Sequence, residues 1–260
     1  MRLPIYQVDA FADRIFAGNP AAVVPLEDWL PNATLQAIAA ENNLSETAFF
    51  VRQGESYALR WFTPTVEVDL CGHATLASAY VVFRFLETER HRVAFETRKA
   101  GTLVVTRRGD ELAMDFPAWP PKPCEVPAGL ADALGRDPGE MLVSGDWLAV
   151  YEREADIAAL KPDFVALRRL DRAVIVTAPG SGGVDFVSRF FAPRAGIDED
   201  PVTGRAHCQL IPYWAKRLGK ARLSARQISQ RGGALSCALD GERVTIAGQA
   251  QLYLEGTITL

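Results

Sequence analysis

Glu46 is the first candidate for chemistry, because it has the setting of a general acid or base. It lies in the string NNLSETAFF, where a helical pattern changes to a strand pattern. We expect the apolar neighbours Ala48, Phe49 and Phe50 to desolvate its carboxyl group. Desolvation raises a carboxyl pKa toward neutrality, where the group can both accept and donate a proton. The alternative is a capping box, in which Ser45 and Glu46 bind backbone N–H groups.

Cys71, His73 and Asp200 are further candidates for chemistry. His73 follows Gly72 in the predicted first turn of a helix. The helix dipole disfavours a cation there, so we expect a neutral imidazole that serves as a hydrogen-bond partner, with a purely structural histidine as the alternative. Cys71 precedes the same glycine, and an internal repeat pairs it with Asp200. We expect these two residues to face each other across a cleft.

Gly72 and Gly204 each begin a predicted buried helix, the first after LC and the second after EDPVT, which ends in Thr203. Helix N-termini carry unpaired N–H groups and a positive partial charge. Two of them facing a cleft would bind a carboxylate, so we expect a small acidic substrate there. The alternative is that the glycines only permit tight entry into a buried helix.

The elements that must position these residues form one pattern in the first half of the chain. Residues 30–43 show apolar side chains at helical spacing after a capping candidate, Asn32 or Thr34. Residues 72–86 are apolar almost all round, which predicts a helix buried on every side. The remaining strings are rich in β-branched and aromatic residues and predict strands: LPIYQVDAF, ETAFFV, YALRWF, RVAFET, GTLVVTRR and ELAMDF.

A proline-rich linker at residues 117–127 separates this pattern from a second copy. Proline fixes φ and removes a backbone donor, so neither a helix interior nor a central strand continues through it. Beyond the linker, residues 203–218 predict a helix. The strands predicted around that helix are VSRFFAP, RLSARQ, ALSCAL, RVTIAG and QLYLEGTITL.

The two halves are also related residue by residue. Gly72 and Gly204 are 132 positions apart, and the segment from Arg60 to Cys71 matches the segment from Arg189 to Asp200 at an offset of 129. A three-residue insertion at 201–203 reconciles the offsets, which favours an internal duplication over chance alignment of glycines. The offset of 132 also relates Gly101 to Gly233, Leu103 to Leu235 and Gly109 to Gly241.

The repeat predicts an α+β fold of two pseudo-symmetric domains. Each would be a curved, mostly antiparallel sheet or barrel wrapped around a central buried helix. We place the N-terminal half at residues 1–118 and the C-terminal half at 119–260, with the last strand crossing back to the first half.

Composition excludes several classes of partner. The net charge is −4 with dispersed charges, whereas nucleic-acid binding usually needs a basic surplus, so we expect no nucleic acid. Asp9 and Asp13 interrupt the region where a signal peptide is apolar, and no stretch approaches the roughly 18 apolar residues of a membrane span. We therefore expect a cytoplasmic protein without membrane contact. Three histidines and four cysteines without a CxxC pair predict no metal site.

Taken together, the motifs resemble the PhzF-like isomerases of phenazine biosynthesis, whose fold is shared with diaminopimelate epimerase. The matching strings run almost from end to end: VDAF, GNPAAVV, NNLSETAFF, RWFTP, DLCGHAT, FFAPRAGIDEDPVTG and AHCQLIPYW.

The resemblance implies proton transfer without metal or cofactor on a small unsaturated or cyclic carboxylic acid, and it implies a homodimer. It places the family's proton-transferring glutamate on Glu46, its helix-start histidine on His73 and its acidic partner on Asp200. Ser45, Cys71, Gly72, Thr203, Gly204 and Arg205 are the expected substrate-binding residues.

One position departs from the family pattern. The TG of the second motif is usually followed by serine, and this chain has Arg205, which could bind a carboxylate or fill the site. We therefore expect an acid other than the phenazine precursor. Two alternatives to the isomerase remain: a non-catalytic acid-binding or scaffold protein on the same fold, and an epimerase or racemase that uses Cys71 and Asp200.

Overall fold

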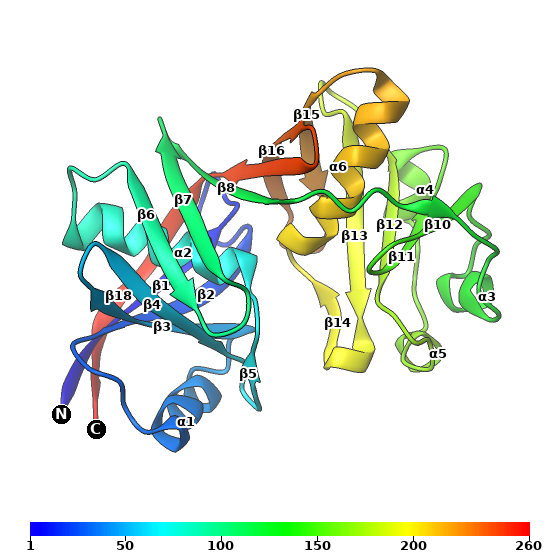
Figure 1. Ribbon diagram of the computed structural model, residues 1–260. Coiled ribbons are helices and arrows are strands. Elements are labelled where there is room, and N and C mark those ends of the chain that lie inside the picture. Colours follow the sequence, from blue (N-terminus) through cyan, green and yellow to red (C-terminus); the bar gives the residue numbers. More distant parts are fainter. The chain divides into compact units, whose positions relative to one another are not determined.

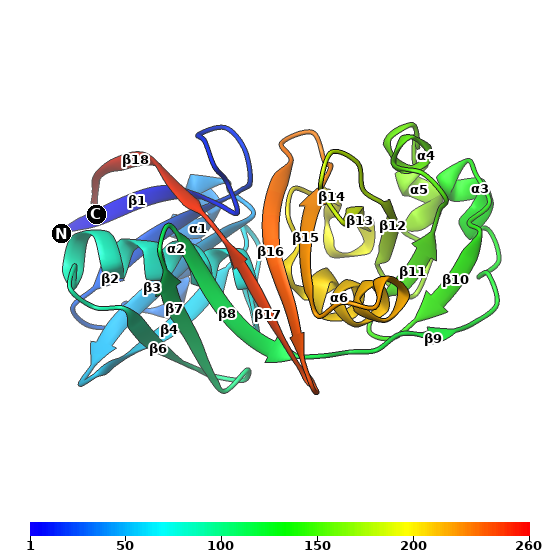
Figure 2. The same cartoon turned by 90° about the horizontal axis from the view of Figure 1, so that it is seen from above.

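The computed structural model describes residues 1–260, which form two compact units (Figures 1 and 2). Unit 1 comprises Met1–Asp115 and Ala247–Leu260, and unit 2 comprises Phe116–Ile246. The sequence-based division after residue 118 lies three residues beyond the end of the first segment of unit 1. The C-terminal segment returns to unit 1, where the sequence places the last strand.

Unit 1 is built on a mixed sheet. β18 pairs with β1, β1 with β2, β3 with β4, β6 with β7 and β7 with β8, all antiparallel, while the β2–β3 and β4–β6 pairs are parallel. A short strand, β5, pairs with β4. The strands are β1 (Arg2–Ala10), β2 (Asn19–Leu26), β3 (Glu46–Gln53), β4 (Ser56–Phe62), β5 (Glu67–Val68), β6 (Arg92–Thr97), β7 (Thr102–Arg108), β8 (Glu111–Pro117) and β18 (Ala250–Thr259).

Helix α2 (Gly72–Val81) lies against the strands of unit 1 and contacts β1, β2, β3, β7 and β18 (Figure 2). Eight of its ten residues are buried, as the apolar string predicts. Its last turn continues as a π-helical segment, η1 (Val82–Leu86). Small side chains such as Ala74 and Ala77 let the helix approach the sheet closely, so the start of α2 is held firmly in place.

Helix α1 (Asn32–Asn42) packs on unit 1 through Leu35, Ile38 and Ala39. The prediction of a side-chain cap at Asn32 or Thr34 is wrong. The helix begins after Pro31, whose carbonyl accepts hydrogen bonds from the helix backbone. The Asn32 side chain instead accepts a hydrogen bond from Arg60, at 3.0 Å.

Unit 2 repeats the pairing order of unit 1. The β10–β11, β12–β13 and β15–β16 pairs are antiparallel, and the β11–β12 and β13–β15 pairs are parallel. This is the sequence of pairings that β1–β2, β2–β3, β3–β4, β4–β6 and β6–β7 follow. The strands are β9 (Lys122–Pro123), β10 (Glu140–Val143), β11 (Trp147–Val150), β12 (Val174–Pro179), β13 (Phe186–Ala192), β14 (Ile197–Asp200), β15 (Arg222–Gln227), β16 (Gly233–Asp240) and β17 (Arg243–Gly248).

Helix α6 (Gly204–Leu218) is the long helix of unit 2 and contacts β15 and β16 (Figure 1). It begins at Gly204, as α2 begins at Gly72, so the two predicted helix starts are correct. A separate core of unit 2 includes residues of the short elements around β10–β13. Those elements are α3 (Leu130–Leu134), α4 (Glu154–Ala158) and α5 (Phe164–Leu167). A 3₁₀ turn, η2 (Pro193–Ala195), follows β13.

The same ion pair occurs in both units. Arg60 binds both carboxylate oxygens of Glu67 at 2.7 and 2.8 Å, and Arg189 binds both oxygens of Glu199 at 2.8 and 2.9 Å. Each guanidinium also lies 4.9 Å from the centre of a phenylalanine ring two positions further along its strand. Bidentate Arg–carboxylate pairs stacked on an aromatic ring are geometrically specific, so they brace equivalent strands in the two units.

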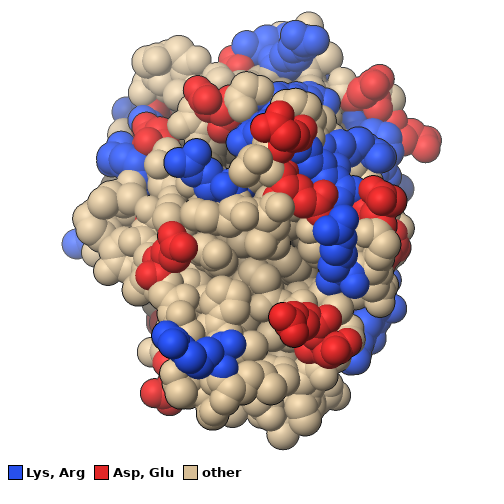
Figure 3. Space-filling view, turned by 90° about the vertical axis from the view of Figure 1, so that its left-hand side faces the viewer, with Lys and Arg blue, Asp and Glu red and all other residues tan.

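On the surface, charges of both signs are mixed. Figure 3 shows basic and acidic side chains interspersed around an uncharged area on the face that lies to the left in Figure 1. Elsewhere in the chain, charged side chains form exposed pairs, such as Lys99 with Asp69 at 2.9 Å. None of the helices is both long enough and apolar enough to span a membrane.

Candidate active site

Glu46 is the first residue of β3 and lies beside Ala21 of the parallel strand β2. The chain reaches this strand from α1 through Asn43, whose backbone is in the left-handed region at φ 50°. Glu46 is only 8% exposed. Because it begins a strand and not a helix, the capping-box alternative for Ser45 and Glu46 is wrong.

Cys71 and His73 lie on either side of the first residue of α2. Cys71 is the N-cap in extended conformation, and its carbonyl accepts hydrogen bonds from the backbone and side chain of Thr75, at 3.2 and 2.6 Å. Both Cys71 and His73 are 6% exposed. The start of a helix that is packed on every side therefore fixes both side chains.

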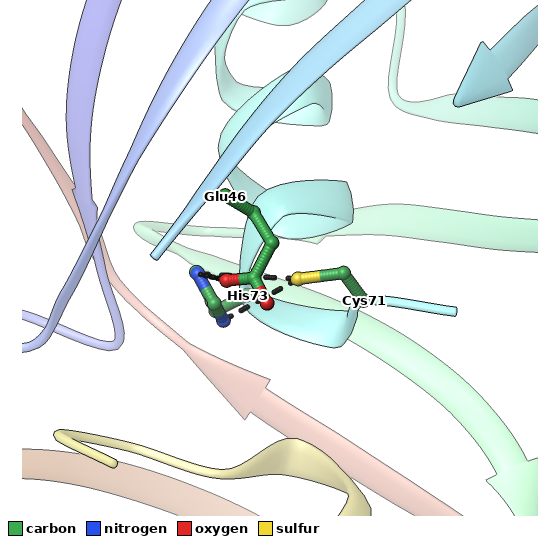
Figure 4. A group of neighbouring side chains, drawn as sticks. All are labelled: Glu46, Cys71 and His73. Atoms are coloured by element: carbon green, nitrogen blue, oxygen red, sulfur yellow. Dashed lines mark hydrogen bonds and ion pairs between the residues drawn. The ribbon is translucent and has the colours of Figure 1, made fainter. Parts of the chain in front are cut away.

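The structure brings Glu46, Cys71 and His73 together (Figure 4). His73 Nε2 lies 3.1 Å from Glu46 Oε2, and Cys71 Sγ lies 3.5 Å from His73 Nδ1. One ligating atom of each side chain falls within 4.8 Å of the others, so this cluster could hold a metal ion. The three residues come from positions 46 to 73, but β3 and the start of α2 place them side by side.

The charges of Glu46 and His73 differ from the sequence-based prediction. Burial alone would raise the pKa of Glu46, but His73 and the Cys71 thiol outweigh burial, and the pKa is lowered. Burial likewise disfavours the His73 cation, but Cys71 and Glu46 raise its pKa well above the ordinary value. The predictions of a raised Glu46 pKa and a neutral His73 are therefore wrong, because each charge stabilises the other. Burial raises the pKa of the Cys71 thiol.

In unit 2, Asp200 and Thr203 form a second polar cluster at the start of α6. Thr203 is the N-cap, and its hydroxyl donates a hydrogen bond to Asp200 Oδ2. Gln227 of β15 donates to the Asp200 carbonyl at 2.7 Å and accepts from the Thr203 N–H at 2.9 Å. All three side chains are buried. The sequence offered no signal for Gln227, because its role depends on the β13–β15 pairing.

His207 lies one turn into α6 and is fully buried. Its Nδ1 is 2.8 Å from the Thr203 carbonyl, which can only accept, so Nδ1 carries the proton. Burial lowers the pKa of His207 to about 4. The ring is therefore neutral at pH 7, and its Nδ1–H group donates a hydrogen bond to the carbonyl of the N-cap residue, Thr203.

Arg205 is the second residue of α6 and is paired within unit 2. Its Nη2 lies 3.1 Å from Asp146 Oδ1, and its guanidinium is 5.9 Å from the Trp119 ring centre. Gln209 also contacts Asp146. Burial raises the pKa of Asp146 although Arg205 opposes this. The sequence missed Asp146, which lies 59 residues before Arg205 and in no recognisable motif.

The remaining predicted residues lie at the ends of elements. Ser45 is the residue before β3, Gly72 begins α2, and Gly204 begins α6. The predicted residues thus lie at the starts of β3 and α2 in unit 1 and at the start of α6 in unit 2. That Cys71 and Asp200 face each other across a cleft stays a prediction.

Comparison with known proteins assigns the chain to a family. The family model described as "Phenazine biosynthesis-like protein" matches residues 8–256. The chain belongs to this phenazine biosynthesis-like family.

Relatives of this PhzF-like chain include an uncharacterized isomerase of Pseudomonas aeruginosa, 58% identical over 100% of both chains. The crystal structure of a PhzF family protein from Enterococcus faecalis matches with a TM-score of 0.97 and 49% identity, covering 100% of both chains. The prediction of an enzyme of the isomerase class is therefore confirmed.

The predicted fold class of the PhzF-like chain is confirmed as well. A hydroxyproline epimerase from Agrobacterium vitis superposes with a TM-score of 0.59 at 12% identity, covering 99% of this chain and 92% of that one. At this low identity the match shows the fold alone, which is the epimerase-like fold expected from the sequence.

Proposed function

We propose that the protein is a cofactor-independent isomerase that moves a proton between two carbons of a small unsaturated or cyclic carboxylic acid. Glu46 is the general acid and base. The observation that carries the proposal is the buried contact between Glu46 Oε2 and His73 Nε2, at 3.1 Å. This contact orients an ionised carboxylate in a site from which most water is excluded.

In the proposed reaction, the Glu46 carboxylate accepts a proton from a carbon next to the unsaturated system. The electron pair of the broken C–H bond delocalises into the conjugated system, and Glu46 returns the proton at another carbon of that system. The substrate is thus isomerised without net gain or loss of atoms or electrons. His73 keeps Glu46 in position between the two steps. The acceleration over the uncatalysed reaction therefore comes chiefly from positioning.

The substrate's carboxylate would be received by backbone N–H groups at the start of α2, at Gly72 and His73. Helix N-termini favour anions in this way. In the same proposal, Asp200, Thr203 and Gly204 of unit 2 bind polar groups of the substrate. Their support is the buried hydrogen-bond cluster around the N-cap of α6.

Arg205 belongs to this proposal as a residue that sets which acid is bound. One of its nitrogens is paired with Asp146, while the side chain remains about half exposed. An anchored guanidinium with donors left over can bind a carboxylate. We therefore propose a substrate other than the phenazine precursor of the family's type reaction.

We also propose that the two units arose by internal duplication and that the chain acts as a cytoplasmic homodimer. The repeated pairing order and the repeated Arg–Glu ion pairs support duplication. The dimer rests on the family resemblance, and sedimentation velocity would measure it directly.

Deuterium exchange into a panel of small unsaturated and aromatic carboxylic acids tests the reaction. We expect the wild-type protein to exchange deuterium into at least one acid, and Glu46→Gln to slow that exchange by about 10²–10⁴-fold, the usual contribution of a general acid–base. Glu41→Gln, which changes an exposed glutamate of α1, is the matched control and should exchange normally. A well-folded Glu46→Gln protein with full exchange would refute the proposal.

A further inference from the structure

The positive charge of Arg205 is unfavourable at its place in the fold. Arg205 is the second residue of α6, and the first turn of this helix contains no acidic residue. The N-terminus of a helix carries a positive partial charge, which disfavours a basic side chain there. Residues that break a local rule of this kind are typical of functional sites, where other groups compensate for them.

Asp146 is the group that compensates for this charge. It directly precedes β11, and its Oδ1 lies 3.1 Å from Arg205 Nη2. The carboxylate is buried, and burial raises the pKa of Asp146 although Arg205 opposes this. Placing a carboxylate in a buried position is costly, and pairing offsets only part of the cost. The pair therefore differs from the exposed ion pairs on the surface.

The exposure of this pair is the reverse of that in the bracing ion pairs of the two units. Arg60 and Arg189 each bind both oxygens of a glutamate, and their side chains are only 4% and 12% exposed. Arg205 uses one nitrogen for Asp146 and is 51% exposed, whereas the Asp146 side chain is 4% exposed. The carboxylate is thus the buried anchor, and the donors on Arg205 Nε and Nη1 are not used by it.

Further contacts fix both members of the pair. Gln209, one turn further along α6, places its side-chain amide against Asp146. Arg172 donates to two carbonyls of the turn before Asp146, at 2.9 and 3.4 Å. The Arg205 guanidinium lies 5.9 Å from the centre of the Trp119 ring. A guanidinium held by a carboxylate and an aromatic ring has a defined orientation.

We propose that Asp146 is a positioning residue, which holds the Arg205 guanidinium so that its remaining donors bind an acceptor group of the substrate. This inference rests on the proposed function, in which Arg205 sets which acid is bound. A side chain that is already ordered loses less entropy when it binds than a mobile one does. Asp146 therefore acts on the affinity for the acid and not on the proton transfer by Glu46.

The positioning is measured without any substrate. Nitrogen-15 relaxation of the arginine Nε–H groups in the full-length protein reports how ordered each side chain is on the ps–ns timescale. We expect Arg205 to be ordered in the wild-type protein and mobile in Asp146→Asn, which removes the negative charge at nearly constant shape. Asp171→Asn, which removes an exposed carboxylate beside Arg172, is the matched control and should leave Arg205 ordered.

Gln209→Met covers the case in which Asp146→Asn does not fold. It removes the amide contact with Asp146 and leaves both charges of the pair in place, so Arg205 should again lose order. An Arg205 side chain that stays ordered in a folded Asp146→Asn protein would overturn the positioning role. If only Gln209→Met folds, retained order of Arg205 in that variant has the same consequence.

Kinetics separate this role from proton transfer. The probe is the panel acid into which the wild-type protein exchanges deuterium fastest. We expect Asp146→Asn to raise KM for this acid by roughly 10–100-fold, the upper value being the loss that a misplacement of 1 Å can cause, and to leave kcat unchanged. An unchanged KM in a folded Asp146→Asn protein would overturn the proposal.

The two proposals fail in different ways. If Glu46→Gln keeps full exchange while Asp146→Asn raises KM, the assignment of Glu46 is wrong and the role of Asp146 stands. If Glu46→Gln abolishes exchange while Asp146→Asn changes nothing, the proposed function stands and Asp146 is structural. If no acid of the panel exchanges, the proposed function fails together with substrate binding by Arg205, and the relaxation measurement still decides whether Asp146 orders this side chain.

Discussion

His207, near the start of α6, makes the stability of the protein depend on pH. Its folded pKa of about 4 is below the ordinary value of 6.5, so the unfolded chain binds the extra proton first as the pH falls. The stability that the neutral ring contributes is therefore complete above pH 6.5 and is lost as the pH falls toward 4. At pH 4.5 this loss amounts to about 2 kcal/mol of the free energy of unfolding.

Urea unfolding at pH 7 and pH 4.5 measures this effect. We expect the wild-type protein to lose about 2 kcal/mol more than His207→Gln over this interval, because the variant has no imidazole to protonate. His91→Gln changes an exposed histidine and should keep the wild-type pH dependence. Equal pH dependence of the wild-type protein and His207→Gln would show that His207 is not held neutral by burial.

Also at the residue scale, the identity of the residues in the candidate active site was easier to predict than their charges. Glu46 and His73 were identified from local strings, but their pKa directions depend on a contact between residues 27 positions apart. Asp146 and Gln227 could not be identified from local strings either, because each contacts its partner, Arg205 or Thr203, only in the folded chain. A sequence pattern shows which groups can ionise, whereas the folded contact decides their charge.

Gly18 shapes the turn between β1 and β2, the strand that flanks the start of β3. Its φ is +65°, and a Cβ atom there would lie 2.2 Å from the Ala10 carbonyl oxygen. Gly18→Ala would combine left-handed strain of about 1–3 kcal/mol with a backbone clash. We expect it to lower the stability of unit 1 and to disturb the position of Glu46.

Gly101→Ala is the matched comparison for this turn. Gly101 has a similar φ of +72°, but a Cβ atom there would have no atom within 4 Å, so this substitution carries the strain without the clash. Urea unfolding should show a larger loss for Gly18→Ala than for Gly101→Ala. Equal losses would mean that contact with Ala10 contributes nothing.

Most elements could be predicted where their periodicity was clear. The strands Arg222–Gln227 and Arg243–Gly248 agree with the predicted strings residue for residue. β2 was missed because Pro20 and Pro25 argue against a central strand. The strands β10–β12 were missed because short apolar runs cannot be assigned to strand or helix by periodicity alone.

At the scale of the whole molecule, the proline-rich linker and the repeat were the informative signals. Prolines interrupt regular structure whatever surrounds them, so a boundary between the two halves near residue 117 could be predicted directly from the sequence. The last strand returns to unit 1 as expected from the sequence, but its partner there is a separate choice, and β1 pairs with both β2 and β18. That choice is made by long-range packing, which one sequence does not display.

The pairing of the two chain ends gives the last prediction. Arg2 of β1 lies opposite Thr259 of β18, and both are exposed. Their neighbours Met1 and Leu260 exchange backbone hydrogen bonds, so the Arg2–Thr259 pair is of the non-hydrogen-bonded type, in which the two Cα atoms are closest. Cysteines at both positions should therefore form a disulfide.

This crosslink would close a loop that contains nearly the whole chain, including all of unit 2. Constraining the unfolded chain in this way stabilises the folded state by about 5–6 kcal/mol in the chain-entropy model. We expect the oxidised Arg2→Cys/Thr259→Cys protein to unfold at higher urea concentration than the same protein reduced, which is its own control. If the oxidised and reduced forms unfold at the same urea concentration, the pairing of β18 with β1 adds little to the stability of unit 1, which carries Glu46.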